Sequence, residues 1–141
     1  SWFSGRRLTG SDSRAQAQIK LAYQPLFSII VPLYKTPLNF FRDMADSVIA
    51  QTYSNWELIL VNSTPDYDGL SDLVSEYVTA DSRIKVTDLE GNLGITENTN
   101  VGIKMAKGDY LCFFDHDDVL EPNILFEYAH ALNQNSDINL L

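Results

Sequence analysis

The amino-acid sequence predicts an α/β fold: a Rossmann-like, doubly wound and mainly parallel sheet whose strands alternate with helices. Two patterns predict it. Short apolar runs rich in β-branched and aromatic residues recur along the 141 residues, and between them lie segments with apolar residues at helical spacing. This alternation repeats four times, which is typical of parallel sheets that carry helices on both faces.

The predicted strands are short runs of strand-forming residues. The first reads Leu-Phe-Ser-Ile-Ile-Val and is expected to end before Pro32. The fourth follows the turn signal Gly108-Asp109 and holds five consecutive apolar residues, which predicts a strand buried on both faces. A fifth is expected to be cut short by the end of the chain. The strands are expected at residues 26–31, 56–61, 84–89, 110–114 and 138–141.

Four amphipathic segments are expected to form the helices that follow these strands. The first begins at Thr36-Pro37, with Thr36 as the N-cap and proline at the first helical position. The last begins near Glu121-Pro122. The helices are expected at residues 37–49, around 70–78, at 96–106 and at 122–134.

Composition and charge argue against several classes of protein. The formal net charge of −9 argues against nucleic acid and anionic membrane surfaces as main partners. The longest apolar run is broken by Pro32, so no membrane span is expected. The single cysteine, Cys112, excludes an internal disulfide and suits a reducing compartment. Because the first residues lack a signal peptide, we expect a cytoplasmic protein, free or at the inner face of the membrane.

The polar N-terminal segment is expected to be separate from the folded domain. Residues 1–25 carry four of the ten basic side chains, and residues 14–23 have the composition of one short helix. We interpret this segment as a leader or linker, with a basic arm that touches a partner as the alternative. Residues 26–141 then form the domain, which is long enough to bury a core.

A parallel doubly wound sheet places its strand-to-helix turns at one edge. In this sequence the four turns hold Tyr34, Asn62-Ser63, Gly91-Asn92 and the acidic residues 115–118. We therefore expect these polar or glycine-bearing turns, which are far apart in the sequence, to meet at one crevice.

The fourth of these turns holds three carboxylates within four sequence positions: Asp115, Asp117 and Asp118. No lysine or arginine follows Lys107, so the C-terminal quarter offers them no basic partner. A hard divalent cation with oxygen ligands is one counter-charge. The alternative is a solvated acidic loop, with Asp118 as a helix cap. The position after a strand predicted to be buried favours the cation, because ligand sites of α/β sheets lie there.

A nucleotide diphosphate fits the same crevice. Glycines in the third turn allow close backbone approach, a nearby helix start offers free N–H groups to an anion, and Tyr34 can pack against a flat ring. Taken alone, each feature is explained as well by a packed surface aromatic or by ordinary turn glycines. Their joint placement on one edge indicates a nucleotide diphosphate bound with a divalent cation.

Four segments in order resemble the family-2 glycosyltransferases. They are residues 27–34 (FSIIVPLY), 47–61 (SVIAQTYSNWELILV), 92–102 (NLGITENTNVG) and 108–118 (GDYLCFFDHDD). The resemblance implies the GT-A fold and transfer of a sugar from a nucleotide donor to an acceptor hydroxyl, with inversion at the anomeric carbon. It also implies surface polysaccharide synthesis, with a UDP-sugar as the favoured donor and a saccharide as the acceptor.

The resemblance assigns roles to residues by position. Asp115 and Asp117 match the D-x-D motif and would hold Mg²⁺ or Mn²⁺ on the diphosphate, with Asp115 also placed to face the ribose. His116, between them, would form a wall of the donor pocket. The residues expected to contact the nucleotide-sugar are Pro32, Leu33, Tyr34, Asn62, Gly91, Asn92, Asp115 and His116.

The sequence departs from the family pattern at two places and in its extent. Asn62-Ser63 stands where members often have an acid that contacts the base, and Thr99 stands where an arginine is frequent. The acceptor half, with the carboxylate that acts as general base, is expected beyond residue 141. We therefore expect a donor-binding part that does not transfer sugar by itself.

Other classes of protein share the predicted sheet. A sugar-phosphate nucleotidyltransferase would be expected to have a glycine-rich, arginine-bearing first loop, and residues 31–35 (VPLYK) contain no glycine. A receiver or flavin-binding module would place its key residues after the first and third strands, whereas the acids here follow the fourth. A non-catalytic nucleotide-binding module stays open, although it has no need of Asp115 and Asp117.

Overall fold

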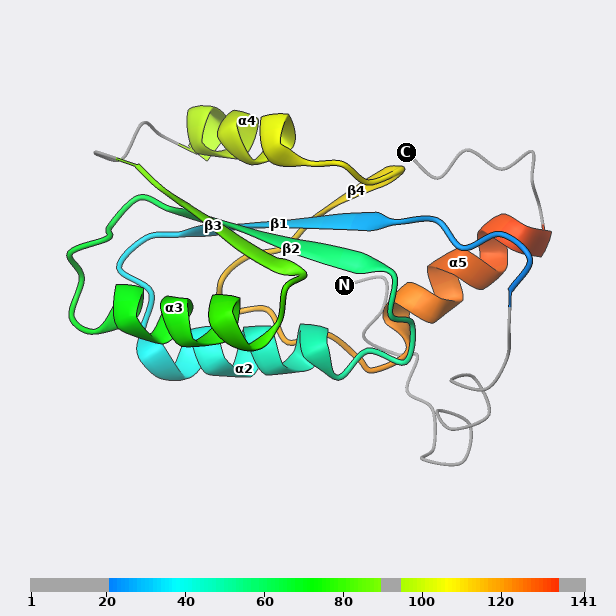
Figure 1. The fold of residues 1–141 in the computed structure, drawn as a ribbon, viewed down its shortest axis with the longest axis horizontal. Coiled ribbons are helices and arrows are strands. Elements are labelled where there is room, and N and C mark those ends of the chain that lie inside the picture. Colours follow the sequence, from blue (N-terminus) through cyan, green and yellow to red (C-terminus); the bar gives the residue numbers. More distant parts are fainter. Residues whose placement is uncertain (1–20, 90–94, 135–141) are drawn as a thin grey trace.

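The computed structural model describes residues 21–89 and 95–134, in which strands alternate with helices (Figure 1). The elements are β1 (Phe27–Leu33), α2 (Leu38–Ile49), β2 (Trp56–Asn62), α3 (Leu70–Ala80), β3 (Ile84–Asp88), α4 (Ile95–Met105), β4 (Tyr110–Phe113) and α5 (Ile124–Gln134). The predicted alternation is confirmed. The strand expected at 138–141, and most of the helix expected at 14–23, lie outside the described residues.

The described strands form one parallel sheet in the order β3-β2-β1-β4. The chain steps outward from β1 through β2 to β3, and then crosses back over the sheet to β4. Helices α2 and α3 cover one face and α4 covers the other (Figure 1). The sheet is therefore doubly wound, as predicted, and its strand order reverses between β1 and β4.

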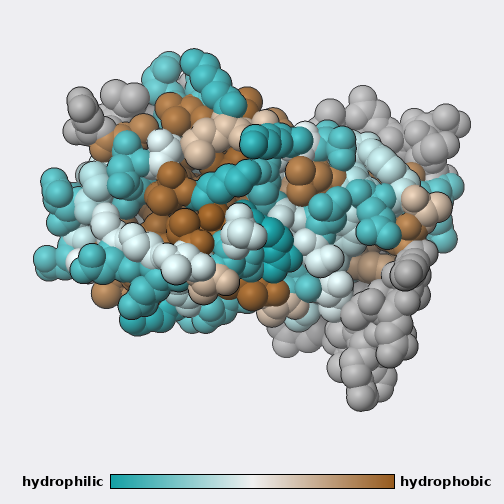
Figure 2. Space-filling view, viewed as in Figure 1, coloured by the Kyte–Doolittle hydropathy of each residue, from teal (hydrophilic) through white to brown (hydrophobic). Residues whose placement is uncertain are grey.

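Side chains of β1 alternate between two apolar cores. Ile29 and Val31 pack in the larger core with α2, α3 and α5, and neither is exposed to solvent. Ile30 points the other way and packs with residues of β2 and α4. The outer edge at β3 is less covered: apolar residues show at the surface between α4 and α3, in the left half of the space-filling view (Figure 2). Burial on both faces of β1 and β2 thus supplies most of the hydrophobic stabilisation.

Strand β4 is only half-buried, so the prediction that it is covered on both faces is wrong. Three of its residues are of intermediate burial, and the last, Phe113, keeps 53% of its surface exposed. The reason is its place in the sheet: in the described part of the chain β4 is an edge strand that pairs only with β1. Helix α4 lies over β1 and β2 instead of over β4.

Strand β1 continues through Pro32, two residues further than predicted. Proline lacks an N–H and normally breaks the ladder of a central strand. Here the carbonyl of Ile30 accepts from Phe114 N at 3.2 Å, on the β4 side of β1. Pro32 faces the same side two residues later, beyond the last pairing between β1 and β4. No neighbouring strand needs the missing N–H, so the proline is tolerated.

Two helix starts differ from the predicted ones. Helix α2 begins at Leu38 with Pro37 at the N-cap position, and no side chain caps it, so the assignment of Thr36 as N-cap is wrong. The Thr36 hydroxyl bonds elsewhere, as described below. Helix α5 begins at Ile124 instead of residue 122, because a turn in which Ile124 N donates to Glu121 O precedes it.

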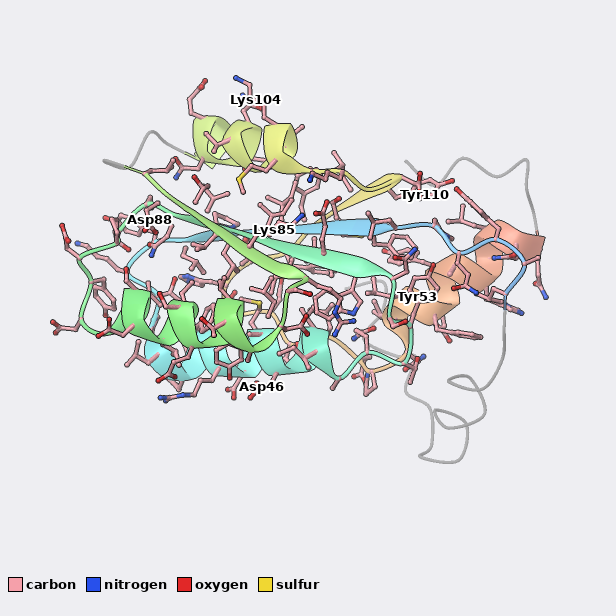
Figure 3. The ribbon with its side chains drawn as sticks, viewed as in Figure 1. Asp46, Tyr53, Lys85, Asp88, Lys104 and Tyr110 are labelled. Carbon is pink, nitrogen blue, oxygen red and sulfur yellow. The ribbon has the colours of Figure 1, made fainter. Side chains whose placement is uncertain are left out.

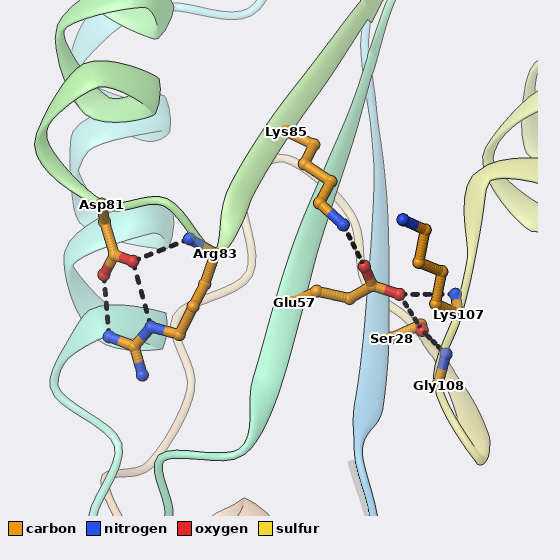
Figure 4. Close-up of polar contacts among 7 residues, drawn as sticks. All are labelled: Ser28, Glu57, Asp81, Arg83, Lys85, Lys107 and Gly108. Carbon is orange, nitrogen blue, oxygen red and sulfur yellow. Dashed lines mark hydrogen bonds and ion pairs between the residues drawn. The ribbon is translucent and has the colours of Figure 1, made fainter.

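The buried carboxylate of Glu57 connects all four strands (Figure 4). From its place on β2 it accepts hydrogen bonds from Lys85 Nζ on β3 at 2.8 Å and from Ser28 Oγ on β1 at 2.6 Å. The backbone N–H of Lys107, just before β4, donates to it at 2.7 Å. Burial raises the pKa of Glu57, but these hydrogen bonds together outweigh burial and hold the pKa below its ordinary value of 4.5.

The turn before β4 approaches β1 so closely that only glycine fits at position 108. Gly108 N donates to Ser28 Oγ at 2.8 Å. A Cβ at this position would overlap Ser28 Oγ and would lie 2.7 Å from the carbonyl oxygen of Leu26. Glycine therefore permits the contact that places the start of β4 beside β1.

Residues 21–25 pack against the domain at the amino edge of the sheet, the edge where the parallel strands begin. Asn133 on α5 accepts from Tyr23 N and donates to Tyr23 O, both at 2.7 Å. Tyr53 donates its hydroxyl to Pro25 O. Phe27 forms ring contacts with Tyr53 and with Tyr110, which are both labelled at this end of the sheet in Figure 3. The aromatic cluster and these hydrogen bonds fix α5 to the sheet.

We predict that Glu57→Gln lowers the free energy of unfolding by about 2 kcal/mol at pH 7, because charged hydrogen bonds at a buried site are lost. The folded-state pKa of Glu57 is lowered, so its contribution is complete above 4.5 and disappears as the pH falls through the folded-state pKa. Urea unfolding at pH 7 and at lower pH measures this difference.

The matched control is Glu76→Gln, an exposed carboxylate on α3, which should change the free energy of unfolding by less than about 0.5 kcal/mol. An equal deficit for Glu57→Gln at pH 7 and well below the folded-state pKa would show that shape, and not charge, is what the site requires.

Candidate functional site at the carboxyl edge of the sheet

Three loops meet at the carboxyl edge, by which we mean the edge where the parallel strands end. Residues 34–37 follow β1, residues 63–69 follow β2 and residues 114–123 follow β4. Asp88, the last residue of β3, lies at the same edge, opposite the end that holds Tyr53 and Tyr110 (Figure 3). The turn predicted to hold Gly91 and Asn92 lies outside the described residues. The predicted meeting of distant turns is confirmed for the three loops that the structure describes.

A cleft of about 340 Å³ opens at this edge between β1 and β4. It exists because β4 ends at Phe113, opposite Ile30, while β1 continues to Leu33. This is the point where the strand order reverses, and ligands of open α/β sheets bind there. The cleft is lined by Ile30, Pro32, Thr99, Phe113, Phe114, Asp115 and Asp118.

The acidic loop, residues 115–118, is a closed turn. Asp118 N donates to Asp115 O at 3.1 Å, and the Asp118 carboxylate accepts from Asp115 N at 2.8 Å. The alternative that Asp118 caps the following helix is wrong, because α5 begins six residues later and the carboxylate is turned back on its own loop. Asp118 therefore fixes the backbone from which Asp115 and Asp117 project.

Asp115 and Asp117 are exposed, and within the described residues no hydrogen bond or ion pair engages their carboxylates. Asp115 lines the cleft, whereas Asp117 is outside its lining. Within the same residues no cluster of three or more His, Cys, Asp or Glu side chains is arranged around a metal position. Mg²⁺ and similar ions on nucleotides are commonly held by one or two carboxylates and completed by phosphate oxygens. Two unpaired carboxylates beside a cleft fit that kind of site.

His116 lies between the two aspartates in sequence but turns away from the cleft. Its Nδ1 is 2.6 Å from Thr36 Oγ1, and its ring meets Phe40 of α2 edge-on at 6.3 Å between centroids. It does not line the cleft that was expected to include it. Instead it joins the acidic loop to the loop after β1.

The loop after β1 is held by backbone hydrogen bonds to side-chain hydroxyls. Tyr34 N donates to Thr36 Oγ1 at 3.2 Å, and Lys35 N donates to Thr64 Oγ1 at 2.8 Å. Lys35 has a φ of 45°, a left-handed conformation that is uncommon outside glycine, asparagine and aspartate. The Tyr34 ring is 47% exposed, with Lys35 Nζ 5.5 Å from its centroid. An exposed ring at this edge is available to a flat ligand.

Two of the residues expected at the site are buried. Leu33 is fully buried in the larger core, so only its backbone faces the loops, where its carbonyl accepts from Ser63 N and Ser63 Oγ. Asn62 is also fully buried, and its Oδ1 accepts from Thr64 N at 3.0 Å. Among residues 21–89 and 95–134, the buried side-chain nitrogen of Asn62 has no hydrogen-bond partner. Both residues therefore support the loops through hydrogen bonds, Leu33 with its carbonyl and Asn62 with its side-chain oxygen.

Sequence reasoning missed the two threonines that hold these loops, Thr36 and Thr64. The sequence pattern predicts a helix cap at Thr36 and indicates no role for Thr64. Glu57 did carry a signal, since it is the one charged residue in an otherwise apolar predicted strand. Cys112 is not a candidate nucleophile, because burial raises the pKa of its thiol to about 12.

A doubly wound sheet with a cleft and unpaired carboxylates at its switch point has the arrangement at which open α/β proteins bind their ligands. Comparison with family models is more specific: the model described as glycosyl transferase family 2 matches residues 28–140. The chain belongs to this family. The parallel sheet is the GT-A type of Rossmann-like fold that the resemblance implied.

Two known proteins are similar to this chain in sequence. The uncharacterized glycosyltransferase EpsJ of Bacillus subtilis is 38% identical over 112 residues, which covers 79% of this chain and 31% of EpsJ. The O-antigen biosynthesis protein RfbC of Myxococcus xanthus is 28% identical over 141 residues, 100% of this chain and 11% of RfbC. The chain therefore spans less than a third of either relative.

Among solved structures, residues 1–349 of TarS from S. aureus in complex with UDP are similar to this chain, with a TM-score of 0.70 and 26% sequence identity. The match covers 78% of this chain and 32% of the TarS chain. No helix in the described ranges has the length and apolar character needed to cross a bilayer.

We predict that Asp118→Ala lowers the free energy of unfolding by about 1 kcal/mol, because Asp115 N loses its charged acceptor. Asp117→Ala is the matched control and should change it by less than about 0.5 kcal/mol, since that carboxylate is exposed and unpaired. Urea unfolding of the two variants measures this difference. Equal free energies of unfolding would show that the turn does not depend on Asp118.

Proposed function

We propose that this chain provides the nucleotide-sugar donor site of a family-2 glycosyltransferase. The observation that carries the proposal is the cleft at the strand-order reversal, with Asp115 in its lining and Asp117 two residues further on. The cleft volume lies at the lower end of the range of small-molecule sites. TarS, whose structure contains UDP, supports a uridine nucleotide as the donor's leaving group.

The proposed roles follow from position. Asp115 and Asp117 hold Mg²⁺ or Mn²⁺ beside the diphosphate, and Asp118 keeps the acidic loop in shape for them. Pro32, in the cleft lining, and Tyr34, with its exposed ring, face the nucleoside. The buried Leu33 and Asn62 act through the backbone that they hold, and Gly91 and Asn92 complete the edge.

In the proposed reaction an acceptor hydroxyl displaces the nucleoside diphosphate from the sugar with inversion. A bound cation neutralises charge that grows on the departing diphosphate. The residues of this chain orient the donor and hold its leaving group in place, which lowers the entropic part of the barrier. Deprotonation of the acceptor needs a general base, which we assign to the acceptor half of the enzyme.

The acceptor is proposed to be a growing surface polysaccharide. RfbC, which matches the whole chain, is an O-antigen biosynthesis protein.

We predict that the chain binds at least one of UDP, dTDP and GDP in a metal-dependent manner, because two carboxylates alone would repel a diphosphate. Calorimetric titration with and without Mn²⁺ measures this. Asp117→Asn is expected to weaken binding at least about tenfold, since a charged ligand of the metal is lost. Asp72→Asn, an exposed acid on α3, is the control and should bind as the unmodified chain does.

Binding of equal strength with and without Mn²⁺, or full binding by Asp117→Asn, would contradict the donor-site assignment.

A further inference from the structure

The side chain of His116 joins two loops that are 80 residues apart in the sequence. On one side it belongs to the acidic loop that carries Asp115 and Asp117. On the other it meets Thr36, in the loop after β1, at 2.6 Å, and the ring of Phe40 in the first turn of α2. No role in the proposed transfer reaction accounts for a histidine held in this way.

The Thr36 hydroxyl is fully buried, so both its oxygen and its hydrogen need partners. The oxygen accepts from Tyr34 N at 3.2 Å. The hydrogen is then free to be donated to His116 Nδ1 in the tautomer that leaves this nitrogen as the acceptor. A single hydroxyl thus fixes both the backbone of Tyr34 and the orientation of the His116 ring.

Hydrogen bonds continue from this loop to the next strand. Lys35 N donates to Thr64 Oγ1, and Thr64 N donates to Asn62 Oδ1 at the end of β2. Lys35 is kept in its left-handed conformation between these contacts. Strained backbone of this kind persists only where its surroundings determine it strongly. The loops after β2, β1 and β4 are therefore connected as one unit, and Thr36–His116 is the link to the acidic loop.

We propose that Thr36 and His116 are positioning residues that hold the acidic loop at a fixed distance from the loop after β1. The inference rests on the proposed function, in which the acidic loop carries the metal-binding end of the donor site and the loop after β1 carries its nucleoside end. A rigid link between the ends lets one ligand engage both without first ordering the loops. Neither side chain touches the ligand.

The test compares variants in the complete chain by titration of UDP in the presence of Mn²⁺. Thr36→Val removes the hydroxyl at similar volume, and His116→Phe keeps an aromatic ring against Phe40 but removes Nδ1. Each is expected to weaken UDP binding about tenfold, the value of one hydrogen bond to a buried group. The double variant is expected to bind UDP no more weakly than Thr36→Val alone, because Thr36→Val already removes the bond that His116→Phe removes.

Two controls separate positioning from general damage. Thr36→Ser keeps the hydroxyl and should bind UDP within about twofold of the unmodified chain. Thr52→Val is the matched threonine substitution, in the segment that precedes β2. Its hydroxyl is buried and has no partner in the described part of the chain, so UDP binding should be unchanged. Urea unfolding of every variant confirms that the chains compared are folded.

The outcomes are distinct. If Thr36→Val and His116→Phe bind UDP as well as the unmodified chain, or if their effects add fully, the positioning role is overturned and the donor site stands. If Thr36→Ser fails as Thr36→Val does, the hydroxyl is not the cause and the inference is overturned. If the unmodified chain binds no nucleotide with Mn²⁺, the proposed function fails first and this inference fails with it.

Discussion

The sheet depends on one buried negative charge. Glu57 accepts hydrogen bonds from β1, from β3 and from the turn that leads into β4. A carboxylate removed from water is stable only when donors surround it, so the four strands and this charge require one another. Gly108 lets the β4 turn come close enough to take part. The start of β4, and hence everything after it, is placed by this contact.

The site follows from a difference in strand length. β1 has seven residues and β4 has four, and their pairing is in register from the first residue of each. The surplus of β1 at the carboxyl edge, where Pro32 faces no neighbour, leaves the space that becomes the cleft. The acidic loop then begins at the mouth of that space. The polar contacts that place the start of β4 at the amino edge thus also determine where the acidic loop stands at the other edge.

The helices and strands could be predicted from the sequence because the patterns that indicate them are local. Helical and strand periodicity report burial within a few residues, so the alternation and the meeting of turns were predicted from the chain alone. The predictions that were wrong concern features that depend on residues far apart in the sequence. Thr36 has the local pattern of an N-cap, and only the folded chain brings His116 to it. β4 has the composition of a strand covered on both faces. Among the described strands it nevertheless lies at the sheet edge, because the chain crosses back from β3 and pairs β4 with β1 alone.

The candidate site divides in the same way. Asp115 and the cleft were found from the acidic run after a strand, which is a signal of composition and position. Leu33 and Asn62 were placed at the site because the resemblance assigns their positions to the donor pocket, and the structure buries both. Within a strand, alternate residues point to opposite faces, so adjacency along the chain does not mean adjacency in a pocket.

The attachment of residues 21–25 has a mechanical meaning. Tyr23 is held by Asn133, Gln24 by Asn55, Pro25 by Tyr53 and Leu26 by Asp109, all at the amino edge. Tension on the chain ahead of residue 21 is therefore carried by α5 and by the segments that precede β2 and β4. The cleft lies at the far end of the strands, away from these points of attachment.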